Sequence, residues 1–193
     1  MKLVATDLMT LERYARERAA FRTRVLDHKR DRQLQVGPHT TWSFEDRLTI
    51  QYQIQEMLRV ERIFEPEGIA EELAAYNPLI PDGRNWKVTL LIEFADSEER
   101  RRQLALLRGI EARCWVQVAG HARVGAIADE DLPRENADKT SAVHFLRFEL
   151  DPAMIGALRA GAALGAGIDH ENYRHSVDPV PAAVRAALLA DLD

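Results

Sequence analysis

Four residues of the chain have side chains that could bind a metal ion: His28, Glu61, His144 and His170. Imidazole nitrogen and carboxylate oxygen suit zinc and iron, so this set could form a mononuclear iron or zinc centre. Such a centre would make the chain a metal-binding protein or a metal-dependent enzyme. The four residues come from separate predicted elements, and their spacing therefore neither supports nor excludes a common site.

Glu61 falls near the centre of the apolar face of a helix predicted for residues 45–64. A buried carboxylate without a partner costs several kcal/mol or takes up a proton. Arg18 and Arg22 lie on the apolar side of a preceding predicted helix and could supply that partner. The alternative to a metal ligand or a general acid or base is therefore an ion pair that locks the two helices.

Each of the three histidines also has a purely structural interpretation. Alternation along a strand predicted for residues 141–150 places His144 on its more apolar side, where a hydrogen-bonded core histidine is common. His170 follows a glycine-rich passage and stands beside acidic residues, which suits a proton relay or an ordinary surface loop. His28 lies at the edge of a helical apolar stripe, next to Asp27.

Arg18, Arg22 and Arg47 are candidates for binding an anion or a partner protein, because guanidinium pairs well with carboxylate and phosphate. An anion site requires the three groups to converge on an open pocket, whereas a carboxylate against each of them indicates structural pairing. Arg18 and Arg22 belong to a basic run over residues 13–32, in a chain of net charge −5. This run is either a solvated helix face or a docking surface.

The sequence lacks the short motifs of common cofactor and catalytic sites. It has no Gly-x-Gly-x-x-Gly, no phosphate-binding loop, no His-Glu-x-x-His and no Cys-x-x-Cys. We therefore identify no cofactor-binding residues and no catalytic residues. The single cysteine, Cys114, cannot form an internal disulfide and alternates with valines, so we expect it in the core.

Length and composition indicate one globular domain over residues 1–193. The acidic balance argues against a nucleic-acid binder. No apolar run is long enough to span a membrane, and the first ten residues do not form a signal peptide. We therefore expect a cytoplasmic protein without a membrane partner, and nothing in the residues decides its oligomeric state.

Periodicity and turn signals predict an α+β fold with a mostly antiparallel sheet, several helices, and two long helices at the N-terminus. A capping box at Ser43 is expected to open the second long helix. Helices are predicted at residues 10–32, 45–64, 69–76, 97–108, 154–164 and 180–192. Strands are predicted at 33–36, 86–94, 113–118, 122–128, 141–150 and, at a sheet edge, 165–169.

Three long stretches, residues 45–59, 76–83 and 139–149, together with the passage 168–170, carry a family resemblance. They resemble the uncharacterised bacterial family known as domain of unknown function 3501. The resemblance implies no established activity. Genes of that family tend to lie beside those of rubrerythrin-like iron proteins and cysteine-rich iron–sulfur proteins.

That genomic setting implies a role in iron-linked redox metabolism or peroxide defence. The first hypothesis is therefore a non-catalytic accessory protein that binds a rubrerythrin-like or iron–sulfur protein and holds no cofactor of its own. The second is the mononuclear metal protein or enzyme described above.

Overall fold

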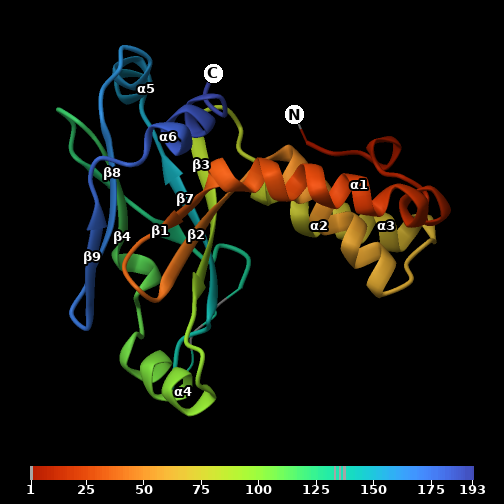
Figure 1. The fold of residues 1–193 in the computed structure, drawn as a ribbon, viewed down its shortest axis with the longest axis horizontal. Helices are drawn as coiled ribbons and strands as arrows, with labels where there is room; N and C mark the ends of the chain where they lie inside the picture. Colours follow the sequence, from red (N-terminus) through yellow and green to blue (C-terminus); the bar gives the residue numbers. More distant parts are fainter. Residues whose placement is uncertain (1, 133, 135, 137) are drawn as a thin grey trace.

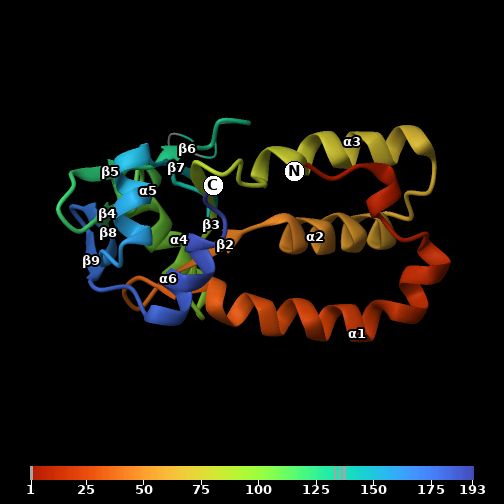
Figure 2. The ribbon, with the colours of Figure 1, turned by 90° about the horizontal axis from the view of Figure 1, so that it is seen from above.

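The computed structural model describes every residue except 1, 133, 135 and 137. Two antiparallel β-sheets share one apolar core, and a layer of three helices extends from one end of the sheets (Figure 1, Figure 2). The predicted α+β class, the antiparallel pairing and the two long N-terminal helices are confirmed.

Three helices that lie side by side form the helical arm: α1 (Leu11–Lys29), α2 (Arg47–Val60) and α3 (Pro66–Tyr76) (Figure 2). Thr10 caps α1, because its side chain accepts a hydrogen bond from the Arg13 amide. The apolar stripe of α1 buries Tyr14, Phe21 and Val25. Burial of side chains of this size stabilises the arm by about 1.5–3 kcal/mol each.

The first sheet has the order β1-β2-β3-β7-β6. Its inner face carries aromatic side chains, among them Trp42 and Phe148, whose rings stack with centroids 5.5 Å apart. Its strands are β1 (Gln33–Gln35), β2 (Thr40–Glu45), β3 (Asn85–Ile92), β6 (Ile127–Ala128) and β7 (Val143–Glu149).

The second sheet has the order β5-β4-β8-β9. Cys114 is buried in the shared core, as its alternation predicts. Gly167 of β8 packs under the Trp115 ring, where an added Cβ would lie 2.4 Å from a ring carbon, so a larger residue does not fit. The strands of this second sheet are β4 (Cys114–Val118), β5 (Arg123–Gly125), β8 (Leu164–His170) and β9 (Tyr173–Val177).

Shorter helices connect and cover the sheets. α5 contacts β4. α6 lies close to the chain end and contacts the turn η2, where the helical arm joins the sheets. The remaining α-helices are α4 (Ser97–Leu106), α5 (Pro152–Arg159) and α6 (Ala182–Leu189). The 3-10 turns are η1 (Ala5–Asp7), η2 (Arg30–Arg32), η3 (Asn77–Leu79) and η4 (Glu111–Arg113).

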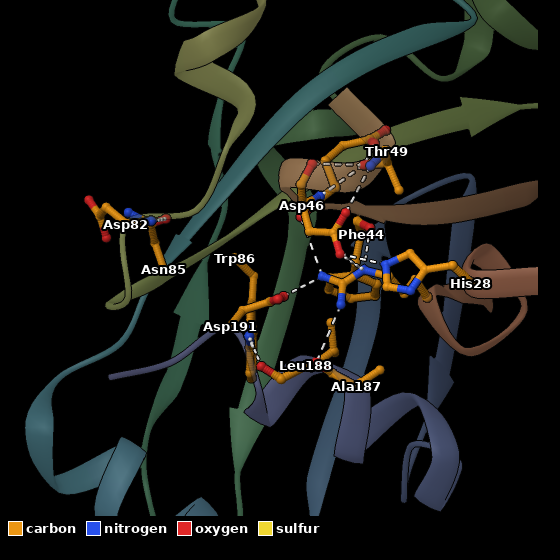
Figure 3. A network of polar contacts seen from close by, with 12 residues as sticks. His28, Phe44, Asp46, Thr49, Asp82, Asn85, Trp86, Ala187, Leu188 and Asp191 are labelled. Carbon is orange, nitrogen blue, oxygen red and sulfur yellow. Dashed lines mark hydrogen bonds and ion pairs between the residues drawn. The ribbon is translucent and has the colours of Figure 1, made fainter. Parts of the chain in front are cut away.

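A buried guanidinium, that of Arg32 in η2, joins the arm to the sheets. Only 3% of Arg32 is exposed, and it forms ion pairs with Asp46 and with Asp191. Its Nε also donates to the Phe44 carbonyl at 3.1 Å. Figure 3 shows His28, Asp46 and Asp191 gathered at this junction. Asp46 caps α2 of the arm, Phe44 belongs to β2 of the first sheet, and Asp191 lies near the chain end. Because Arg32 contacts all three, the network fixes the arm relative to the sheets.

Two boundary predictions around the second helix are wrong. Residues 43–45 belong to β2, because Phe44 points into the core, and the capping box is formed by Asp46 and Thr49 instead of beginning at Ser43. The helix also ends at Val60 rather than continuing to residue 64. Arg62 adopts a positive φ of 56°, which no helical residue has.

Two strand predictions also need correction. The segment 165–169 is not an edge strand, since β8 pairs with both β4 and β9. The true edge strand, β9, exposes three of its five residues and therefore resembles a loop in sequence. The strand predicted over 122–128 is divided between the sheets: β5 pairs with β4, whereas β6 pairs with β7.

None of the helices in the described part of the chain is long and apolar enough to cross a membrane.

Candidate functional site

The four predicted metal ligands do not form one cluster. Among the described residues, no group of three or more His, Cys, Asp and Glu side chains is arranged to hold a metal ion. His28 instead pairs with Asp46, with 2.5 Å between Nε2 and Oδ2. The prediction that Glu61 is buried is wrong: it follows the last turn of α2 at the open end of the arm, where no neighbouring element covers it.

His144 is fully buried and lies between a carboxylate and a hydroxyl. Its Nδ1 is 2.6 Å from Asp129 Oδ2, and its Nε2 is 2.9 Å from Thr140 Oγ1. The order hydroxyl, imidazole, carboxylate is that of a nucleophilic triad. Thr140 is only 1% exposed, however, so the hydroxyl offers no surface to a substrate. The arrangement therefore links β7 to the two ends of the segment 129–140.

His170 uses both ring nitrogens in structural hydrogen bonds. Nε2 lies 2.9 Å from the Arg108 carbonyl, and Nδ1 accepts a hydrogen bond from the Asn172 amide at 3.2 Å. His170 thus holds the β8–β9 turn against the end of the α4 segment.

The three predicted anion-binding arginines do not converge on a pocket. Arg18 forms two hydrogen bonds to Glu56, at 2.7 and 2.8 Å, and Arg47 pairs with Asp7 at 2.8 Å. Arg22 is exposed on α1. Two of the three guanidinium groups are therefore neutralised by carboxylates, which is the structural pairing considered above. The partner of Arg18 is Glu56 instead of Glu61.

Glu56 of α2 is the carboxylate that binds Arg18 across the helical arm. Arg18 first, and the Tyr14 hydroxyl in addition, lower the pKa of Glu56 to about 2, although burial opposes the shift. The Tyr14 hydroxyl donates to Glu56 Oε1 at 2.6 Å, and the same contact together with burial raises the pKa of Tyr14. Tyr14 and Arg18 are spaced i, i+4 on α1, so they lie on one face of the helix and both contact the Glu56 carboxylate. This spacing is the signal in the sequence from which a carboxylate partner could have been expected.

The side of α1 that faces away from α2 is solvent-exposed along its length. We define the α1 outer face as Arg16, Ala19, Arg22, Thr23 and Leu26, all exposed, with Leu26 at 46%. Neither arginine of this face forms an ion pair with a residue in the described part of the chain. α1 carries six Lys and Arg against three Asp and Glu, so it is cationic in an acidic protein.

A cleft lies in the corner between the helical arm and the outer face of the first sheet. Two adjoining pockets of about 360 and 300 Å³ form it, and both are lined by Tyr76, Leu79 and Phe145. We call this the corner cleft. Lys87 and Arg147 line one end from β3 and β7, and Lys29 of α1 lines the other. Its size is that of a typical small-molecule site.

Most charged groups of the corner cleft are already paired. Arg147 forms two hydrogen bonds of 2.7 Å with Glu130 and also pairs with Glu149. Arg134 lies over the Phe145 ring, 4.5 Å from its centroid, and pairs with carboxylates of its own segment.

Lys87 is different, because its ammonium group has no hydrogen bond or ion pair with any residue that the structure describes. Glu45, directly opposite on β2, is held by the hydroxyls of Thr49 and Thr89, at 2.6 and 2.7 Å. Burial lowers the pKa of Lys87, and the neighbouring Arg147 lowers it further, whereas nearby carboxylates, Glu130 first, oppose the shift. Sequence reasoning missed Lys87, because alternation with Trp86 and Val88 makes it resemble an ordinary solvent-facing strand residue.

The fold and its corner cleft define an α+β protein of two antiparallel sheets with a helical arm. The chain belongs to the family of proteins of unknown function DUF3501, whose profile matches residues 2–192. It is similar to a novel protein of unknown function from Burkholderia pseudomallei K96243, known from a crystal structure, with 50% identity and a TM-score of 0.92 over 100% of both chains. Comparison with curated proteins finds no match.

Proposed function

We propose that this chain is a non-catalytic accessory protein that binds an acidic partner through the α1 outer face. The observation that carries the proposal is the exposure of Arg16 and Arg22, beside the small residues Ala19 and Thr23 and the apolar Leu26. Arginine is enriched at protein interfaces, and small neighbours allow a flat surface to approach closely.

The charge distribution supports this choice of surface. α1 is cationic while the whole chain carries a net charge of −5, so the exposed arginines of the outer face favour an acidic protein as the partner. Such complementarity accelerates encounter and selects the orientation of the complex. Behind the face lies the packed cluster of Tyr14, Phe21 and Val25, which provides a rigid support and no polar cleft.

The partner class follows from the family resemblance. The genes beside this family suggest a rubrerythrin-like iron protein or an iron–sulfur protein of a redox or peroxide-defence system. In this role the accessory chain needs no metal ligands of its own. His28, His144 and His170 then serve the fold through their hydrogen bonds and ion pairs.

Sedimentation velocity of an equimolar mixture tests the proposal. The chain and a rubrerythrin-like protein from the same organism are expected to sediment as one complex at about 0.05 M salt and to separate at about 0.5 M, because salt screens exposed charges. Separate sedimentation at low salt, for this protein and for a neighbouring iron–sulfur protein alike, would contradict it.

A further inference from the structure

The corner cleft has the two properties of a ligand site that the docking role does not use: an apolar wall and a cation with no hydrogen bond or ion pair to any residue that the structure describes. The wall is formed by Tyr76 and Leu79 from the arm and by Phe145 from β7. The cation is Lys87, on the adjacent strand β3. Pockets that bind small molecules typically combine such a wall with a few polar groups that orient the ligand.

The position of Lys87 follows from the sheet register. Lys87 lies opposite Glu45 on β2 and opposite Arg147 on β7, so the three side chains form a row across the outer face of the sheet. The outer two are occupied, since Glu45 accepts from two threonine hydroxyls and Arg147 binds Glu130 and Glu149. The middle member of the row is therefore the one that is open to a ligand.

The apolar wall begins beside this row. Phe145 lies opposite Thr89, one step along the same face from Lys87, and the Arg134 guanidinium lies over its ring. Leu79 and Tyr76 close the cleft from the arm. An elongated apolar group can thus lie along the sheet while its polar end remains at Lys87.

The surrounding charges limit the ligand to a single negative charge. Glu72, Glu130 and Asp131 also line this end of the cleft, and their charges repel further negative charge there. At this end of the cleft, where Lys87 is the cation without a hydrogen bond or ion pair among the described residues, a phosphate dianion would meet these carboxylates; Lys29, also unpaired, lies at the far end. A carboxylate matches that single cation.

From this arrangement we infer that the corner cleft binds a small organic acid, with its carboxylate on the Lys87 ammonium and its apolar body against Phe145, Tyr76 and Leu79. The inference is independent of docking at the α1 outer face, because α1 contributes only Lys29, at the far end of the cleft. The protein would then be an accessory protein that also takes up a small acidic metabolite.

Isothermal titration calorimetry with two probe acids, decanoate and 2-naphthoate, tests the inference. At least one of them is expected to bind, and the uncharged alcohol of the same skeleton is expected to bind at least about tenfold more weakly because it lacks the charge. The alkyl or aryl phosphate of that skeleton is expected to bind no more tightly than the acid. Absence of binding by both acids, or equal binding of acid and alcohol, would overturn the inference.

Two substitutions test whether the acid binds in the corner cleft. Lys87→Met keeps the aliphatic stem and removes the charge, and it is expected to weaken the acid at least about tenfold without changing binding of the alcohol. Ala75→Trp fills the cleft from an exposed position of α3 and is expected to abolish binding of both. Lys2→Met, at an exposed lysine outside the cleft, is the control. Unchanged acid binding in either cleft variant would show that the acid binds elsewhere.

Discussion

The imidazole Nδ1 of His144 lies 2.6 Å from Oδ2 of Asp129, a residue 15 positions earlier in the chain. Asp129 also accepts the Phe145 amide through Oδ1 at 2.9 Å and has a positive φ of 47°. One carboxylate therefore fixes the start of the segment that supplies Glu130, Asp131 and Arg134 to the wall of the corner cleft.

Replacement of His144 by alanine is expected to destabilise the fold strongly. The substitution leaves a cavity and removes one of the partners of the Asp129 carboxylate, and Glu111 Oε2, 3.9 Å from Nε2, already lacks a hydrogen bond among the described residues. We expect a loss of about 2–4 kcal/mol in the free energy of unfolding, measured by urea denaturation. His121→Ala, in the β4–β5 turn, is the control and is expected to cost less than about 0.5 kcal/mol. Similar losses of unfolding free energy in both variants would mean that the contact of His144 with Asp129 stabilises the fold no more than an ordinary turn residue does.

The Glu56–Arg18 pair predicts how stability responds to acid. The pKa of Glu56 falls from an ordinary value of 4.5 to about 2 in the folded chain. The stabilisation is therefore fully present above the unfolded pKa and is lost as the pH falls from 4.5 towards 2. Solvent at the edge of the pair screens it, so we expect about 1–2 kcal/mol.

Urea denaturation of Glu56→Gln between pH 7 and pH 2 checks this prediction. The variant is expected to be less stable than the native chain at neutral pH and to approach it at the acid end, because the native carboxylate is then protonated too. Glu71→Gln, exposed on α3, provides the matched control. A constant difference between the two proteins across the pH range would contradict the assignment.

The Arg32 network predicts a coupling between the helical arm and the chain end. Arg32→Met leaves Asp46 and Asp191 without their buried cation and is expected to cost about 3–5 kcal/mol in the free energy of unfolding. Adding Asp191→Asn removes one of the stranded charges and is expected to recover part of that cost. Thermal or urea unfolding of the four proteins of this double-mutant cycle measures the coupling. Strictly additive effects would show that the two residues do not act together.

The local part of the fold could be predicted from the sequence because it depends on neighbouring residues. A helix is predicted over residues 10–32, and the stripe of Tyr14, Phe21 and Val25, all three buried, follows from helical spacing within it. The position of Cys114 follows from strand alternation in the same way.

The candidate sites depend on tertiary placement, which the sequence does not reveal. Lys87 has the pattern of any outward strand residue, and only the position of the arm over the sheet makes it part of a cleft. Glu61 shares the helical phase of the buried face of α2, but the helix ends before it. Glu56, which does pair with Arg18, lies on the flank of that face, where periodicity alone indicates solvent.

Docking at the α1 outer face is tested most directly by reversing its charge. The double variant Arg16→Glu and Arg22→Glu is compared with Arg100→Glu and Arg101→Glu, which makes the same charge change on exposed positions of α4. The measurement is the affinity of each for the rubrerythrin-like partner, by biolayer interferometry at low salt. We expect the α1 variant to bind at least about tenfold more weakly than the native chain, and the α4 variant to remain within about threefold. Equal weakening by both variants, or none by either, would contradict the proposal that this face carries the partner.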